Sequence, residues 1–162
     1  MMMRLGGLLA ILAIGVLPTT AFAQGEVSVE RGLQVSITGG CHDCHTEGYR
    51  ESEGVIDPAK AMKGSSVGFR GPWGTTYPQN LRNTVRAFDE KTFVQYIKHG
   101  LRMRPPMPWY NLRAMDDSDV RSLYLYLSSL GDPGKDAPTY VFPTDEPKTP
   151  YVVFAPPTIP KE

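Results

Sequence analysis

Residues 41–45 read Cys-His-Asp-Cys-His, and this short run constrains the chain more than any other feature. Cys41 and Cys44 are the only two cysteines, so no disulfide framework can form. The C-x-x-C-H string is the attachment motif for c-type haem. Two thiols on one helical turn can reach the two vinyl groups on one side of a porphyrin, and the next imidazole then projects toward the iron. The motif predicts one haem c, held covalently by Cys41 and Cys44 and ligated by His45.

Two other uses of the cysteine pair fit the sequence less well. A structural zinc site needs four protein ligands, and only His42, His45 and His99 stand beside the cysteines, with no second C-x-x-C. A thioredoxin-like redox pair sits where a strand passes into a helix of a βαβ unit, and no strand-rich pattern surrounds this pair.

A second ligand for the iron is expected in a segment that reads Met-Arg-Pro-Pro-Met-Pro-Trp. A thioether is a soft ligand that raises the reduction potential relative to a second imidazole. Met107 stands between Pro106 and Pro108, which stiffen the backbone around it, so Met107 is the predicted axial ligand. Met103 is the alternative, and His99 is a weaker candidate because a histidine at a helix end commonly serves as a cap.

The first 23 residues have the pattern of an export signal. Arg4 is their only charge, an apolar or glycine run covers 5–17, and a small-x-small pattern ends at Ala23. The run is too short for a membrane-spanning helix, which needs roughly 20 apolar residues. We therefore expect cleavage after Ala23, location in the periplasm and no membrane span afterwards.

Charge in the whole chain is balanced, with 17 basic and 17 acidic side chains. A nucleic-acid backbone attracts proteins with a clustered positive field, so no nucleic-acid partner is expected. Arg102, Arg104 and Arg113 surround the methionine segment. They are either a docking face for a redox partner or ordinary solubilising residues.

Three segments show helical periodicity. The first runs from about residue 29 to the Gly39-Gly40 pair, and the second covers 89–99 behind an N-cap at Asp89. The third, 117–130, carries the regular apolar stripe of a core-facing helix. Residues 46–80 are broken by glycine and proline and are expected to be mostly irregular, packed against the haem.

The C-terminal segment, 132–162, differs in composition, since eight of its 31 residues are proline. Extended structure is expected there. Its tyrosine, phenylalanine and valine residues make it too apolar for a solvated linker. We expect this tail to wrap over the domain or to dock to a partner.

Taken together, these strings resemble a class I monohaem cytochrome c over residues 27–131. More narrowly, 71–81 and the Met107-Pro108-Trp109 string are similar to haem domains in cytochrome subunits of bacterial alcohol and aldehyde dehydrogenases. This chain differs from those multi-haem subunits in having one motif only. The resemblance implies a small all-α fold around one haem, with the first and last helices crossing where Gly39 and Gly40 face Tyr124 or Leu127.

The expected organisation is a signal peptide at 1–23, a haem domain at 24–131 and a proline-rich extension at 132–162. Within the haem domain, Trp73, Tyr77 and Asn80 are candidate haem contacts, with ordinary loop packing as the alternative.

A haem whose two axial positions are filled by protein leaves no open site for a substrate, so its chemistry is one-electron transfer. We expect an electron-transfer protein rather than an enzyme, serving a dehydrogenase or a respiratory chain as a free carrier or a small subunit. Its partners would be redox proteins such as a dehydrogenase subunit or a terminal oxidase. The alternatives are a haem enzyme or gas-binding sensor with an open sixth position, and an interaction module built on the tail.

Overall fold

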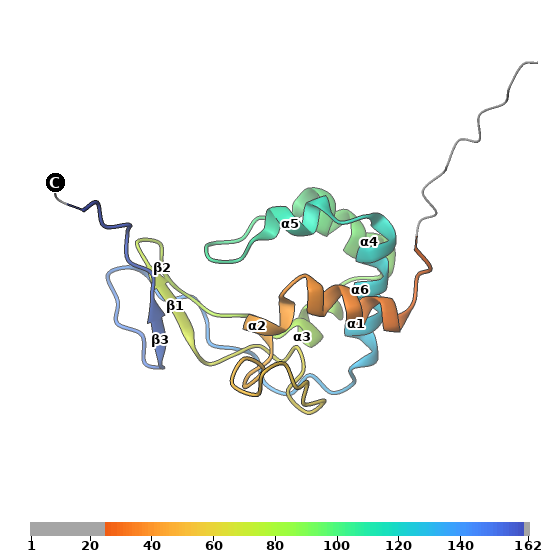
Figure 1. Ribbon diagram of the computed structural model, residues 1–162, viewed down its shortest axis with the longest axis horizontal. Helices are drawn as coiled ribbons and strands as arrows, with labels where there is room; N and C mark the ends of the chain where they lie inside the picture. Colours follow the sequence, from red (N-terminus) through yellow and green to blue (C-terminus); the bar gives the residue numbers. More distant parts are fainter. Residues whose placement is uncertain (1–24, 161–162) are drawn as a thin grey trace, which may run out of the picture.

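The computed structural model describes residues 25–160, in which the helices surround one apolar cluster and a small sheet lies at one end (Figure 1). The predicted export signal, 1–23, lies outside the described residues. Between residues 25 and 160, no helix has the length and apolar character that crossing a membrane requires. In chain order the helices are α1 (Val29–Thr38), α2 (Cys41–His45), α3 (Leu81–Val85), α4 (Glu90–Gln95), the π-helix η1 (Tyr96–Gly100), α5 (Trp109–Ala114) and α6 (Asp117–Ser129).

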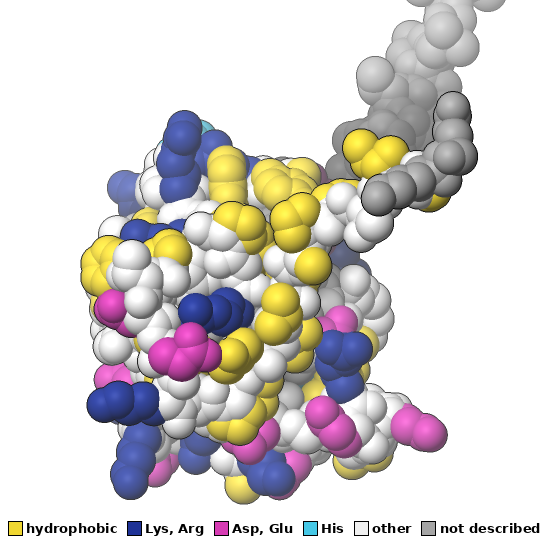
Figure 2. Space-filling model, turned by 90° about the vertical axis from the view of Figure 1, so that its left-hand side faces the viewer, with side chains coloured by type: hydrophobic (Ala, Val, Ile, Leu, Met, Phe, Trp, Pro, Cys, Tyr) yellow, Lys and Arg dark blue, Asp and Glu magenta, His cyan; other side chains and the backbone are white. Residues whose placement is uncertain are grey.

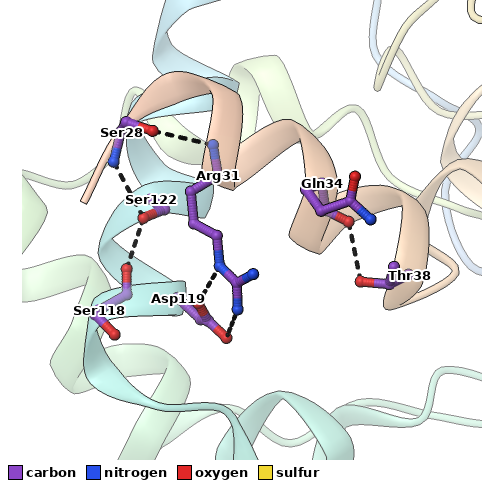
Figure 3. Close-up of polar contacts among 7 residues, drawn as sticks. All are labelled: Ser28, Arg31, Gln34, Thr38, Ser118, Asp119 and Ser122. Carbon is purple, nitrogen blue, oxygen red and sulfur yellow. Dashed lines mark hydrogen bonds and ion pairs between the residues drawn. The ribbon is translucent and has the colours of Figure 1, made fainter. Parts of the chain in front are cut away.

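Helices α1 and α6 pack against each other and form the main helical contact (Figure 3). Ser28 caps α1, because its hydroxyl accepts a hydrogen bond from the backbone N–H of Arg31, while its own N–H donates to Ser122 Oγ on α6. Arg31 also forms a two-point ion pair with Asp119, at 2.8 and 3.0 Å. The two helices approach closely at Gly32, where any Cβ would clash with the Ser122 carbonyl.

The predicted role of Gly39 and Gly40 in this crossing is wrong, because Gly32 occupies the contact, about two turns earlier in the helix. Gly39 ends α1, and Gly40 adopts the left-handed conformation at φ 68° that starts α2. The pair is therefore a turn between helices, and it lets α2 begin at once after α1.

The second predicted helix is present in two parts. The Asp89 carboxylate accepts a hydrogen bond from Thr92 N at the start of α4, as its N-cap position predicts. The helix then continues as η1 and ends at Gly100. Phe93 and Ile97 on this helix join Val120 and Leu123 of α6 in the hydrophobic core.

The prediction of an all-α fold is wrong for one part of the molecule, which is a three-stranded sheet of order β2-β1-β3. Strands β1 (Gly68–Gly71) and β2 (Gly74–Thr76) form an antiparallel hairpin. Strand β3 (Tyr151–Val153) then pairs in parallel with β1, with Val152 opposite Phe69. Strands of three or four residues are too short to show a recognisable alternation of apolar and polar side chains. The second partner of β1, strand β3, also lies about 80 residues further along the chain.

The tail packs against its own domain over much of its length. Val141 forms a two-way backbone bridge with Thr75, and the Tyr140 hydroxyl donates a 2.6 Å hydrogen bond to the Trp73 carbonyl. Nearer the start of the tail, Asn80 Nδ2 donates to the carbonyl of Pro133 at 2.8 Å. These contacts, together with β3, tie the tail to the β1–β2 hairpin and to the start of α3.

Candidate functional site

The two cysteines lie on α2, a helix of only five residues that starts directly after the left-handed Gly40. Cys41 and Cys44 are both partly buried and free. Burial raises the pKa of the Cys41 thiol to about 11, and it also raises the pKa of Cys44. Both groups are therefore protonated thiols at neutral pH, unlike the thiolates of reactive or redox-active cysteine pairs.

His45, the last residue of α2, is buried, and its orientation is fixed by one hydrogen bond. Its Nδ1 lies 2.7 Å from the carbonyl of Gln79. A carbonyl only accepts, so Nδ1 carries the proton and Nε2 keeps a lone pair. Burial lowers the pKa of His45, although the hydrogen bond to the Gln79 carbonyl acts in the opposite direction. The lowered pKa favours the neutral ring. His45 is thus held in the tautomer and charge state that bind a metal through Nε2.

His42, between the cysteines, has no exposed surface and lies in a hydrogen-bond network that the sequence did not reveal. Ser36 Oγ donates to the Leu33 carbonyl, so it accepts from His42 Nε2 at 3.1 Å. His42 Nδ1 then accepts from Thr46 Oγ1 at 2.8 Å, and that oxygen accepts from Met62 N. Burial lowers the pKa of His42 to about 4.

This network occupies both ring nitrogens of His42, so His42 is not available as a metal ligand. Within residues 25–160, no three His, Cys, Asp or Glu side chains gather so as to hold a metal ion. His99, the third histidine, is exposed on η1.

The segment between η1 and α5 carries the two candidate methionines. In Figure 1 it lies across from α2. Met107 is partly buried and packs against the same hydrophobic cluster that Cys41 borders. Met103 has 41% of its surface exposed. Of the two, Met107 is therefore the one whose side chain reaches the interior that α2 also borders.

Met107 has further support from the sheet. The Thr76 hydroxyl, at the end of β2, donates to the Pro105 carbonyl two residues before Met107. The Arg104 guanidinium lies over the ring of Tyr140 in the tail, 4.1 Å from its centroid. The sheet and the tail thus both hold the methionine segment.

The three candidate haem contacts have different surroundings. Asn80 is buried and fully engaged: it caps α3 through its side-chain oxygen and donates to the tail through Nδ2. Tyr77 is buried, and its hydroxyl accepts from Thr149 Oγ1. Trp73 differs, because its Nε1 is buried and has no hydrogen-bond partner among the described residues. Of these three side chains, Trp73 therefore has the unused polar group.

Comparison with known proteins reveals two distant relatives. The chain is 29% identical over 119 residues to a nicotinate dehydrogenase subunit of Pseudomonas putida, and the match covers 68% of this chain and 9% of that protein. It is 28% identical over 131 residues to the fructose dehydrogenase cytochrome subunit of Gluconobacter japonicus, covering 75% of this chain and 25% of that protein. No protein-family model matches the chain, and no solved structure matches it.

The chain thus spans a quarter or less of the length of these relatives. Both relatives are subunits of dehydrogenases, and the name of one identifies it as a cytochrome. The chain is therefore distantly similar to dehydrogenase-associated subunits, a finding compatible with a role in electron transfer.

Proposed function

We propose that this protein is a periplasmic one-electron carrier with a single haem c. In this proposal Cys41 and Cys44 hold the haem as thioethers, and His45 Nε2 and Met107 ligate the iron. The observation that carries the proposal is the state of His45: a buried, neutral imidazole whose Nδ1 proton is committed to the Gln79 carbonyl, directly after the two thiols.

The chemistry of the thiols and of Trp73 fits a covalently bound haem. The thiols are protonated and only partly buried, which suits addition across two vinyl groups better than binding of a metal ion as thiolates. The buried Trp73 Nε1 is a donor that needs an acceptor, and the acidic substituents of a haem are acceptors. These features support the cofactor independently of the sequence motif.

A haem supplies an iron that takes up and releases one electron. The residues of this chain would supply the ligands of that iron and hold them in place. The Gln79 carbonyl holds His45 in its binding tautomer, and the Thr76 and Tyr140 contacts hold the segment whose Met107 would supply the thioether. With His45 and Met107 both bound, the iron would have no open site for a substrate, and its chemistry would be the transfer of electrons between proteins.

The relatives suggest where such a carrier would act. Because they are subunits of dehydrogenases, we propose that the donor or acceptor is a dehydrogenase subunit, with this chain as a free carrier or as a small subunit of the complex. The second protein with which the carrier exchanges electrons would be a respiratory protein such as a terminal oxidase.

The test is to isolate the chain from a bacterial host that attaches haem c and to record its mass and its optical spectra. We expect the mass of the chain after cleavage plus one haem, and oxidised and reduced spectra of a low-spin haem with a methionine ligand. Carbon monoxide and cyanide should bind slowly, because both axial positions are filled. A colourless protein with the mass of the bare chain would refute the proposal, and rapid carbon monoxide binding would favour a gas-binding haem protein instead.

A further inference from the structure

The segment that leads from η1 into α5 exposes an unusual group of side chains, here named the arginine surface: Arg102, Met103, Arg104, Trp109 and Tyr110. Arg102 and Arg104 are exposed, Met103 is 41% exposed and Tyr110 is 62% exposed. Trp109 is partly buried between them. Arginine, tryptophan, tyrosine and methionine are the residue types that protein interfaces favour over the rest of the surface.

The guanidinium groups of this surface are held by aromatic rings. Arg102 lies over the Trp109 ring at 5.9 Å from its centroid. Arg113 lies over the same ring at 4.6 Å but is not part of this surface, because its Nη2 donates to the carbonyls of His99 and Leu101. Arg104 lies over Tyr140 at 4.1 Å. Stacking of this kind fixes a guanidinium and leaves its N–H groups at the plane's edge free to bind a carboxylate.

None of these arginines is neutralised within the part of the chain that the structure describes. The ion pairs among residues 25–160 involve other cations: Arg31, Arg70, Lys98 and Arg121. The sequence from 97 to 115 contains no acidic residue. A solubilising arginine is commonly mobile or paired with a nearby acid, whereas these are fixed and unpaired.

Charge is also distributed unevenly over the molecule. The loop that follows α2 carries four exposed acidic residues beside the exposed Arg50 and Lys60, and it lies at the opposite side of the molecule from α5 (Figure 1); the acids are Glu47, Glu51, Glu53 and Asp57. Figure 2 shows Lys and Arg side chains without Asp or Glu beside them at the upper left of the face in view, whereas acidic and basic side chains are interspersed over its lower half. Such an asymmetry orients an approaching partner by its field.

We propose that the arginine surface docks a carboxylate-rich face of the protein that exchanges electrons with this chain. The assignment of the partner as a redox protein rests on the proposed function, since the surface belongs to the segment that carries Met107. The unpaired, ring-held guanidinium groups would bind carboxylates, and Trp109, Tyr110 and Met103 would supply the apolar contacts between them.

The binding is tested with poly-L-glutamate as a carboxylate-rich probe, added at low ionic strength to the isotope-labelled full chain as isolated with its haem. Backbone amide NMR signals should shift mainly within residues 98–113. The double variant Arg102→Gln, Arg104→Gln should bind roughly tenfold more weakly, because two charge contacts are lost. The matched control is Arg50→Gln, Lys60→Gln, which removes two exposed positive charges from the loop that follows α2 and should change the affinity less than about twofold.

Signal shifts elsewhere, or equal weakening by both double variants, would overturn the proposal. A parallel experiment replaces poly-L-glutamate by vesicles rich in phosphatidylglycerol. If the vesicles bind through the arginine surface and poly-L-glutamate does not, the surface meets a membrane and the proposal is wrong. Binding of poly-L-glutamate needs no electron transfer, so loss of the proposed function and loss of this docking surface are separate results.

Discussion

The hydroxyl of Thr76 donates a 2.8 Å hydrogen bond to the carbonyl of Pro105, which joins the end of strand β2 to the segment that carries Met107. The stacking of Arg104 on Tyr140 adds a second link, this time to the tail. A weak ligand such as a thioether depends on the protein to hold it in place. The sheet, absent from the predicted fold, thereby gains a role in the candidate site.

Replacing Thr76 by Val should loosen this link. Loss of one hydrogen bond corresponds to about 1 kcal/mol, so we expect the methionine–iron bond of the oxidised protein to weaken roughly fivefold against competing cyanide. Cyanide titration of the oxidised haem and the methionine-dependent absorption band measure the effect. Thr144→Val is the control, since the hydroxyl of Thr144 bonds only to the exposed Asp145. Equal cyanide affinity in the two variants would contradict the bracing role.

Substitution of the two candidate methionines should separate them. Met107→Ala is expected to abolish the methionine–iron signature, to permit rapid carbon monoxide binding and to lower the reduction potential. Met103→Ala should leave all three properties close to those of the parent, because the Met103 side chain is 41% exposed and does not join the hydrophobic core. The reverse pattern would transfer the ligand assignment to Met103.

The buried His42 should make stability depend on pH. Its pKa in the folded protein is lowered to about 4, whereas an unfolded chain binds the proton near pH 6.5. Below pH 6.5 the unfolded state therefore holds more protons. The folded protein is therefore most stable, as far as His42 is concerned, above pH 6.5. Its free energy of unfolding falls by up to about 3 kcal/mol as the pH falls toward 4.

Urea unfolding of the haem-containing protein at about pH 7 and about pH 4.5 measures this loss, with His42→Gln as the comparison. The variant lacks the titrating ring, so it should be less stable at neutral pH and should lose less stability on acidification. His45 is present in both proteins, so its contribution cancels when their losses are compared. An identical loss in both proteins would show that His42 is not the group responsible.

The crossing of α1 and α6 should not tolerate a side chain at Gly32. In Gly32→Ala, the added methyl group would clash with the Ser122 carbonyl, a backbone atom that cannot rotate away. We expect a loss of at least about 3 kcal/mol in the free energy of unfolding, or no folded protein. Gly25→Ala is the control, because nothing lies within 4 Å of that position. A stable Gly32→Ala protein would mean that the helices cross elsewhere.

Small inorganic oxidants offer a kinetic test of the charge around the arginine surface. Arg102→Gln, Arg104→Gln should slow oxidation of the reduced haem by ferricyanide, an anion, about threefold at low ionic strength. The same variant should accelerate oxidation by the cationic tris(phenanthroline)cobalt(III). The control Arg50→Gln, Lys60→Gln should alter both rates much less. Parallel changes in both variants would place electron exchange away from this surface.

Helices α1, α4 and α6 were predictable because each carries its own local signals. The Asp89 cap and the apolar stripe of α6 specify their helices without reference to the rest of the chain. The sheet could not be predicted in this way, since β1 is completed by a strand from a proline-rich tail. Helix α5 also escaped prediction, because its six residues follow a run of prolines that suggests only a loop.

Some site residues are recognisable from a motif, whereas others are not. The chemistry of Cys41, Cys44 and His45 follows from their spacing, and that assignment remains a prediction. The Gln79 carbonyl that fixes His45 and the hydroxyls that hold His42 come from residues with no motif of their own. Gly32 shows the same limit: a glycine in a helix is visible in a sequence, but the backbone that approaches it is not.

The parallel pairing of β3 with β1 also sets an order of events during synthesis. Strand β1 pairs with β2 first, and its other partner, β3, is synthesised after every helix between residues 25 and 160. The helices can therefore assemble around α1 and α6 first, and β3 then adds to the edge of β1. A polypeptide released a few residues short of Tyr151 would keep its helices but leave one edge of β1 without a partner.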